Sequence, residues 1–230
     1  MSKRTTLFLI VTFLICLLYF KRHYVREVYV CFFTSYSSVI EEKVKRFNSQ
    51  IVKPNGIFFA GNSLIESFDL SVFNSDEIYN RGIGGEKTDG LLKRLDKILQ
   101  HKPSKIFLEI GINDVFANQN PNEILKNYSA IIKKVRQDSP ETTLYIHSLL
   151  PVCVKNGFFV DNTKANQVIR IVNSGLIELC NGLNVKYIDL HSLMINEPTK
   201  SLREELTYDG VHLNNKGYTL WIKTLENYLN

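Results

Sequence analysis

Apolar residues along this chain alternate between short continuous runs and longer stretches with a helical period. The runs suit strands that are buried on both faces, and they cover residues 57–60, 78–80, 105–110, 143–148 and 185–190. The helical stretches cover residues 88–100, 122–138, 162–180 and 214–228. Strands that alternate with helices of this length predict βαβ units, and therefore a mainly parallel sheet with helices on both faces. A site is then expected in the loops that follow the strands.

The first 26 residues have a different pattern. Residues 7–20 are almost entirely apolar and lie between two basic pairs. At about 1.5 Å per residue this run spans ~21 Å, which is short for a hydrocarbon core of roughly 30 Å but sufficient for a signal sequence. No small-x-small cleavage site follows the run, so the pattern favours an uncleaved signal anchor over residues 1–26. A cleaved signal peptide and a buried core helix are the alternatives.

The remaining chain divides into a linker and one domain. Residues 27–50 are expected to form a juxtamembrane linker with a short amphipathic helix over 39–47, and residues 51–230 a catalytic domain. A chain of 230 residues with 44% hydrophobic content can bury one sizeable core but is short for two. The formal net charge is +5, yet the residues from Glu27 onward carry 23 basic and 23 acidic side chains. The basic excess therefore lies at the N-terminus, and no nucleic-acid partner is predicted.

The cysteine and histidine positions do not indicate a metal site. The four cysteines stand at positions 16, 31, 153 and 180, without a CxxC pair or regular spacing. A disulfide between Cys153 and Cys180 stays open at this point. His147 and His191 lie at strand ends without clustered acidic or cysteine partners.

A serine and a glycine-rich loop follow the first two apolar runs. Gly61-Asn62-Ser63-Leu64 places a serine at a strand-to-helix turn, where its hydroxyl can face solvent, although an ordinary turn with a helix N-cap would look the same. Residues 80–85, Asn-Arg-Gly-Ile-Gly-Gly, enter the next helix and offer backbone N–H groups to an anion. The loop lacks the residues of a phosphate-binding or dinucleotide-binding motif, and a plain structural turn is the alternative.

Two further polar motifs follow later runs. Gly111-Ile112-Asn113-Asp114 comes after the third, and the asparagine amide is a neutral donor suited to a developing oxyanion; a simple turn is the other interpretation. Asp209-Gly210-Val211-His212 precedes the last helix. At this spacing the carboxylate can reach Nδ1 of the imidazole and leave Nε2 pointing into a site, whereas in isolation the motif could be a turn beside a surface histidine.

In this order the four motifs resemble the SGNH (GDSL-like) hydrolase family, over residues 57–221. The branch with the strongest resemblance contains platelet-activating-factor acetylhydrolase-like proteins and bacterial carbohydrate acetylesterases, which share Leu149-Leu150-Pro151 after the fourth strand. The resemblance implies an α/β fold, a flavodoxin-like three-layer α/β/α sandwich with a parallel sheet in the order 2-1-3-4-5. It also implies a carboxylic ester hydrolase that needs no metal or cofactor.

The resemblance assigns roles to particular residues. Ser63 would be the nucleophile, His212 the base and Asp209 the residue that orients the base. The backbone N–H groups of Ser63 and Gly82 and the side-chain amide of Asn113 would form the oxyanion hole.

One position departs from the family pattern. The family commonly has aspartate before the serine, and here Asn62 keeps the size and one acceptor but removes the charge. We expect this change to tune the site without abolishing it. The G-x-S-x-G elbow of the α/β-hydrolases is absent, since position 65 is Ile.

The sequence therefore predicts a serine esterase that hydrolyses short-chain carboxylic esters, O-acetyl esters in the first place, on a small molecule or glycan. No long apolar lid segment is visible between Pro151 and Asp161, which favours a short acyl group. A lysophospholipase or thioesterase of the same fold and a catalytically silent, membrane-presented binding module are the alternatives. The N-terminal segment predicts a membrane-anchored or exported protein with its catalytic domain on the extracytoplasmic side.

Overall fold

The computed structural model describes residues 38–153 and 162–229. The predicted signal segment over 1–26 and most of the stretch between Pro151 and Asp161 lie outside these residues. By its contacts the chain divides into two compact units, residues 1–50 and 51–230. The described part of the first unit is a helix over 38–49, at the place where a short amphipathic helix is predicted.

A five-stranded parallel sheet forms the centre of the second unit. The strands are β1 (Ile57–Gly61), β2 (Ile78–Gly82), β3 (Lys105–Glu109), β4 (Thr143–His147) and β5 (Lys186–Ile188). They pair in the order β2-β1-β3-β4-β5, which confirms the predicted fold class. Since β1 lies between β2 and β3, the loops that leave these three strands meet at one edge of the sheet.

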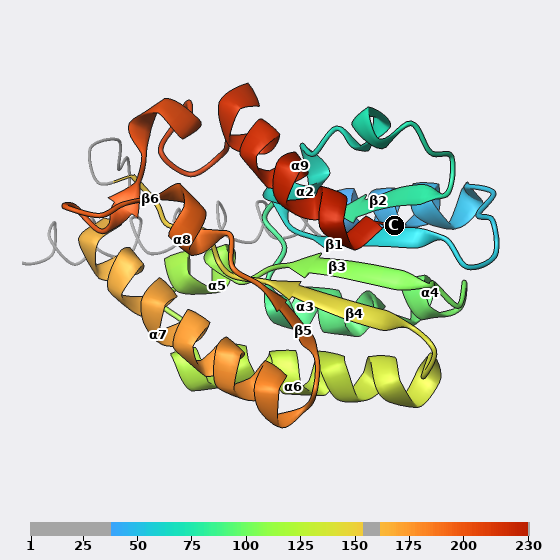
Figure 1. Ribbon diagram of the computed structural model, residues 1–230. Coiled ribbons are helices and arrows are strands. Elements are labelled where there is room, and N and C mark those ends of the chain that lie inside the picture. Colours follow the sequence, from blue (N-terminus) through green and yellow to red (C-terminus); the bar gives the residue numbers. More distant parts are fainter. Residues whose placement is uncertain (1–37, 154–161, 230) are drawn as a thin grey trace, which may run out of the picture. The chain divides into compact units, whose positions relative to one another are not determined.

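Helices cover both faces of this sheet (Figure 1). One face carries α3 (Thr88–Arg94), α4 (Asp96–Leu99), α6 (Pro121–Asp138) and α7 (Asn162–Gly182). The other carries α2 (Ser63–Glu66), the 3-10 turn η1 (Leu70–Phe73), α8 (His191–Met194) and α9 (Asn215–Leu229). The shorter elements are α5 (Ile112–Phe116), β6 (Ile195–Asn196), β7 (Ser201–Leu202) and η2 (Glu204–Leu206).

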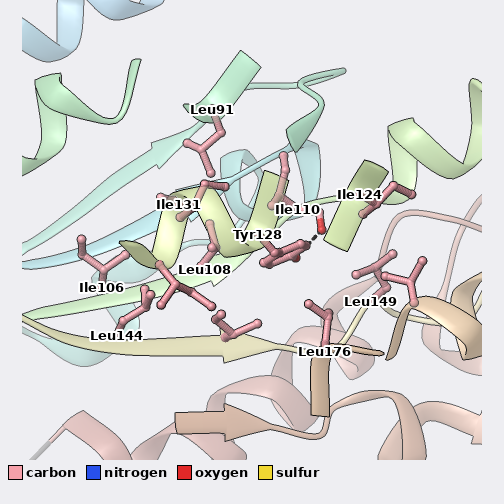
Figure 2. Close-up of a cluster of buried hydrophobic side chains, with 14 of the residues drawn as sticks. Leu91, Ile106, Leu108, Ile110, Ile124, Tyr128, Ile131, Leu144, Leu149 and Leu176 are labelled. Atoms are coloured by element: carbon pink, nitrogen blue, oxygen red, sulfur yellow. Dashed lines mark hydrogen bonds between the residues drawn. The ribbon is translucent and has the colours of Figure 1, made fainter. Parts of the chain in front are cut away.

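The core has two parts because successive residues of each strand point to opposite faces. Ile106, Leu108 and Leu144 point toward α6 and α7, where Tyr128 is fully buried and donates its hydroxyl to the Ile110 carbonyl at 2.5 Å (Figure 2). Phe59, Phe107 and Trp221 belong to the part on the other face, with the Phe59 and Phe107 rings stacked at 4.8 Å. Trp221 is completely buried.

Three asparagines of α7 hold the extended segment after β4. Asn173 Oδ1 accepts from the Leu149 N–H at 2.8 Å, and its amide donates to the Leu149 carbonyl at 2.9 Å. Asn166 pairs in the same two-way manner with Val152, at 2.9 and 2.7 Å, and Asn162 donates to the Cys153 carbonyl. All three asparagines are buried. Each amide therefore satisfies backbone groups of a segment that is not a strand of the sheet.

The structure divides one predicted helix and contains short elements that the sequence pattern did not predict. The predicted helix over 88–100 is divided at Leu95, whose N–H donates to Leu92 in a 3-10 manner at 3.4 Å, so α3 and α4 are separate helices. The β6–β7 hairpin was not predicted, because two-residue strands leave no measurable periodicity in a sequence.

Cys153 and Cys180 are both buried free thiols, so they do not form the disulfide that the sequence left open. Within residues 38–153 and 162–229, no helix is long and apolar enough to cross a membrane.

Candidate active site

Ser63 begins α2 directly after β1. Asn62 is the N-cap of this helix, and its Oδ1 accepts the Leu64 N–H at 2.8 Å. The preceding turn requires glycine, because a Cβ on Gly61 would lie 1.9 Å from the Glu109 carbonyl oxygen. This tight turn brings the Ser63 hydroxyl to the end of the sheet and leaves the side chain partly exposed.

The structure brings Ser63 together with the two residues of the C-terminal motif. Ser63 Oγ lies 2.9 Å from Nε2 of His212, and Nδ1 of the same imidazole lies 2.6 Å from Oδ2 of Asp209. The three side chains thus form a continuous hydrogen-bonded chain across 149 residues of sequence. A hydroxyl, an imidazole and a carboxylate in this order can remove a proton from the serine and stabilise the imidazolium that results.

The loop that carries His212 is fastened at several points. The Thr207 hydroxyl donates to the His212 carbonyl at 2.6 Å and accepts the Gly210 N–H at 2.9 Å. Asp209 Oδ1 accepts the backbone N–H groups of Val211 and His212 at 2.9 and 2.7 Å. The imidazole is consequently fixed by its own loop before any substrate arrives.

Asp209 remains ionised in this environment. Partial burial on its own would raise the pKa of its carboxyl group, but the hydrogen bonds from the His212 side chain and from the backbone of Val211 and His212 outweigh it. The net result is a pKa below the ordinary value. A charged carboxylate can therefore hold the His212 tautomer in which Nδ1 carries the proton.

Gly82 does not offer its N–H to this site, contrary to the expectation from the sequence. The Gly82 N–H donates to Asn80 Oδ1 at 2.8 Å, while the Asn80 amide caps the end of α2 by donating to the carbonyls of Ile65 and Phe68. A Cβ on Gly82 would lie 2.1 Å from the Glu66 nitrogen. Close packing of β2 against α2 is thus the physical reason for glycine at this position.

Gly85, later in the same loop, has a backbone N–H in a more suitable position. Its φ is +76° and it is exposed, and its N–H has no hydrogen bond to any residue that the structure describes. The residues on either side place it beside the serine: a Cβ on Gly84 would lie 3.7 Å from the Ser63 Cβ, and the Glu86 carbonyl accepts the Asn113 amide at 2.9 Å. The Gly-Gly pair of the loop was the sequence signal for this position.

Three donors are therefore available in the segments around Ser63. They are the N–H of Gly85, the N–H of Ser63, which likewise has no partner among the described residues, and the second amide hydrogen of Asn113. Because Glu86 holds the Asn113 amide through the first hydrogen, the second has a fixed direction. Fixed donors of this kind can stabilise an oxyanion.

A buried ion pair supports the loop with Gly85. Arg94 Nε and Nη2 bind the two carboxylate oxygens of Glu86 at 2.6 Å each, with both side chains nearly inaccessible to solvent. Burial raises the pKa of Glu86, and Arg94 counteracts this effect. Asp114 adds a second link, since it accepts the N–H and hydroxyl of Thr88 at 3.0 and 2.6 Å. The sequence did not reveal the Glu86–Arg94 pair, because eight-residue spacing is no recognised motif.

Two titratable side chains lie buried beneath the site, at the ends of neighbouring strands. Glu109 ends β3, and burial raises its pKa to about 8 against a smaller lowering by Asn62. His147 ends β4, and burial lowers its pKa to about 3. Among the described residues, neither side chain has a hydrogen-bond partner of normal geometry. Both groups are therefore uncharged near neutral pH.

The described residues contain no group of three histidine, cysteine, aspartate or glutamate side chains that could hold a metal ion. His147 stacks on Phe107 at 5.9 Å and makes an edge contact with Trp221 at 5.3 Å. It is thus a core residue on the β4 strand.

Solved structures with this fold include several hydrolases. A protein from Streptococcus pneumonia, described as a platelet activating factor, is 31% identical, with a TM-score of 0.78 over 87% of this chain and 97% of its own. An acetyl xylan esterase, AlAXEase, is 23% identical, with a TM-score of 0.61 over 76% of this chain and 100% of its own. At this lower identity the likeness to the esterase concerns the fold.

A curated relative and a family match complete the comparison. The N-acylneuraminate cytidylyltransferase of Escherichia coli O18:K1:H7 is 28% identical over 189 residues, which are 79% of this chain but only 41% of that protein. Residues 61–220 match the GDSL-like Lipase/Acylhydrolase family and include every residue of the site. This match, over most of the length, establishes that the chain belongs to the GDSL-like lipase/acylhydrolase family of serine carboxylic ester hydrolases.

Proposed function

We propose that this protein removes a short acyl group, in the first instance acetyl, from an ester carried by a carbohydrate, through an acyl-serine intermediate. The observation that carries the proposal is the hydrogen-bonded chain from Ser63 Oγ to His212 Nε2 at 2.9 Å and from His212 Nδ1 to Asp209 at 2.6 Å. This arrangement activates a serine hydroxyl for attack on a carbonyl carbon.

In the first step Ser63 Oγ attacks the ester carbonyl while its proton passes to His212 Nε2. Asp209 stabilises the imidazolium through its ionised carboxylate. The carbonyl oxygen becomes an oxyanion that accepts hydrogen bonds from the N–H groups of Ser63 and Gly85 and from the Asn113 amide. Each such donor lowers the barrier by on the order of 3 kcal/mol. His212 then returns the proton to the alcohol oxygen as the ester C–O bond breaks.

In the second step water attacks the acyl-serine. His212 takes the water proton, the same donors stabilise the second oxyanion, and Ser63 Oγ leaves with the proton from His212. The products are the free acid and the regenerated enzyme. In both steps His212 thus accepts and returns the proton, so no further acid or base is required.

The substrate class is supported by the comparisons. The structural neighbour AlAXEase is an acetyl xylan esterase, so one protein with this fold acts on acetylated carbohydrate. The curated relative is named for an N-acylneuraminate, which is a sugar acid. Both names point to carbohydrate chemistry, and we propose an acetylated carbohydrate for this chain as well.

A series of p-nitrophenyl esters tests the acyl preference. We expect kcat/KM to be highest for the acetyl ester and to fall at least about tenfold by the octanoyl ester, because each additional methylene that a site excludes costs about 1 kcal/mol or more. Initial rates across acetyl, butyryl, hexanoyl and octanoyl esters measure this. A maximum at octanoyl, with hydrolysis of a lysophospholipid or an acyl thioester, would replace this proposal by a lysophospholipase or thioesterase.

We also propose that residues 1–26 anchor or export the protein, with the catalytic domain on the extracytoplasmic side. The support is the apolar stretch over 7–20 between two basic pairs. The full chain should then sediment with membranes or leave the cytoplasm, and a chain that lacks residues 1–26 should stay in the soluble cytoplasmic fraction. Equal distribution of the two chains on fractionation would contradict the proposal.

A further inference from the structure

The alcohol part of a bound ester must lie on the side of Ser63 where His212 is, because His212 gives a proton to the alcohol oxygen. On the proposed mechanism, His212 Nε2 gives its proton to the alcohol oxygen as the C–O bond breaks, so that oxygen must come within hydrogen-bond distance of Nε2. The carbonyl oxygen must instead face Gly85 and Asn113. The alcohol part therefore leaves the site along the surface beside His212.

A groove of about 510 Å³ has Tyr208 in its lining, and the ring of Tyr208 stacks on the His212 imidazole. It lies between the end of α2, η1, the loop that contains Tyr208, and the start of α9. Its volume falls within the range of roughly 300–1,000 Å³ that is usual for small-molecule sites. The residues that carry its chemistry are Ser67, Asp69, Tyr208, Asn215, Tyr218 and Thr219.

Tyr208 joins this groove to the reacting groups. Its ring lies nearly parallel to the His212 imidazole, with an interplanar angle of 13° and centroids 5.9 Å apart. At the same time Tyr208 is 66% exposed, which is unusual for so large an aromatic side chain. Its backbone N–H donates to the His212 carbonyl, so the main chains of the two residues are linked beside the ring contact. An aromatic face fixed next to the leaving oxygen suits the C–H face of a sugar ring.

The polar side chains of the groove suit hydroxyl groups and disfavour a negative charge. Asp69 is its only charged lining residue in the described part of the chain, and its Oδ1 accepts the N–H and hydroxyl of Ser71. These hydrogen bonds lower the pKa of Asp69, so it is an anion, and its Oδ2 can accept a hydroxyl. A carboxylate on the ligand would be repelled.

From this geometry we infer that the groove beside Tyr208 binds the alcohol part of the substrate and that this part is an uncharged sugar. The inference rests on the proposed ester hydrolysis and names its leaving group. It also separates this protein from the curated relative, whose name specifies a sugar acid.

Three acetyl esters with different alcohol parts test the inference: p-nitrophenyl acetate, acetylated xylobiose and O-acetylated N-acetylneuraminic acid. We expect the wild-type protein to have a kcat/KM for acetylated xylobiose at least about tenfold above that for the acetylated sugar acid. Tyr208→Ala should lower the ratio of kcat/KM for acetylated xylobiose to that for the aryl acetate by about tenfold, whereas Tyr208→Phe keeps the ring and the ratio. Leu193→Ala, a partly exposed residue of α8 outside the groove, is the matched control.

Asp69→Asn tests the charge separately. This substitution should lower the ratio of kcat/KM for acetylated xylobiose to kcat/KM for the acetylated sugar acid by about fivefold, because it removes the repulsion between the Asp69 carboxylate and the carboxylate of the sugar acid. An unchanged ratio in Tyr208→Ala, or a wild-type preference for the sugar acid, would overturn the inference. An equal loss with all three esters in Tyr208→Ala would also overturn it, since the ring would then only support His212.

Failure of the proposed ester hydrolysis has a different signature, namely no turnover of any of the three esters. In that case a binding measurement tests whether the groove binds a sugar. Saturation-transfer NMR of unacetylated xylobiose with Ser63→Ala should show contacts to the sugar C–H groups, and the same experiment with Ser63→Ala/Tyr208→Ala should lose them. Equal signals from the two proteins would exclude the groove as a sugar site.

Discussion

Replacing Ser63 by alanine should reduce kcat by on the order of a millionfold and abolish labelling by a fluorophosphonate. The substitution removes the only oxygen that His212 Nε2 holds at 2.9 Å, and no acyl-enzyme can form without it. Fluorophosphonate labelling read on a gel, together with rates on p-nitrophenyl acetate, measures both effects. Ser192→Ala, which changes an exposed serine of α8, should label and react like the wild type.

Asn113→Ala provides the contrast that separates the nucleophile from its supporting donors. This variant loses one of three oxyanion donors but retains Ser63 and His212, so it should still be labelled while kcat falls by about a hundredfold to a thousandfold. Near-normal turnover or labelling of Ser63→Ala would show that the four motifs coincide by chance. A catalytically silent binding module would then be the better description.

The second large effect concerns stability, which should decrease on both sides of a plateau between about pH 4.5 and 6.5. Glu109 has a pKa of about 8 in the folded protein and an ordinary value of 4.5. Between these values only the folded state holds the proton, so stability falls as pH rises. His147 has a pKa of about 3 when folded and an ordinary value of 6.5, so between these values only the unfolded state holds the proton and stability falls as pH decreases.

The two effects cancel where their windows overlap, from pH 4.5 to 6.5. Outside the overlap each contributes about 1.4 kcal/mol per pH unit, so the free energy of unfolding should fall by on the order of 2 kcal/mol by pH 8 and by a similar amount by pH 3. Urea denaturation followed by the fluorescence of Trp221, the single tryptophan, measures it.

Single variants separate the two sides of this profile. Glu109→Gln should reduce the loss above pH 6.5, and His147→Phe should reduce the loss below pH 4.5, because an amide and a phenyl ring do not titrate. The phenyl ring can keep the stacking of His147 on Phe107. An alkaline loss of full size in Glu109→Gln would contradict the prediction, because it would show that groups other than Glu109 cause the loss.

The strand positions and three members of the site could be predicted from the sequence because their signals are local. Continuous apolar runs mark strands that are buried on both faces, and all five runs became strands of the sheet. The spacing of Asp209 and His212 already permits their contact, whereas Ser63, 149 residues from His212, was assigned through the resemblance of the four motifs to the family; the structure brings the three side chains together.

The oxyanion donor in the glycine-rich loop over residues 80–85 could not be chosen from local sequence signals. Choosing between Gly82 and Gly85 requires knowing which N–H is already taken, and that depends on Asn80 folding back across the end of α2. The Glu86–Arg94 pair and the buried Glu109 were missed for a similar reason. Burial and partner identity arise from tertiary packing, which residue type and spacing do not encode.

The asparagines of α7 have a consequence for how this sequence can change over evolution. The amides of Asn166 and Asn173 bind the peptide groups of Val152 and Leu149, in the two-way manner of one peptide group with another. The backbone at 149 and 152 is therefore held by any residue that has an N–H, and substitutions other than proline at these two positions are limited by core packing. At 166 and 173 even aspartate would fail, since it cannot donate. Among proteins that descend from this chain, substitutions should accordingly be more frequent at 149 and 152 than at Asn166 and Asn173 of α7.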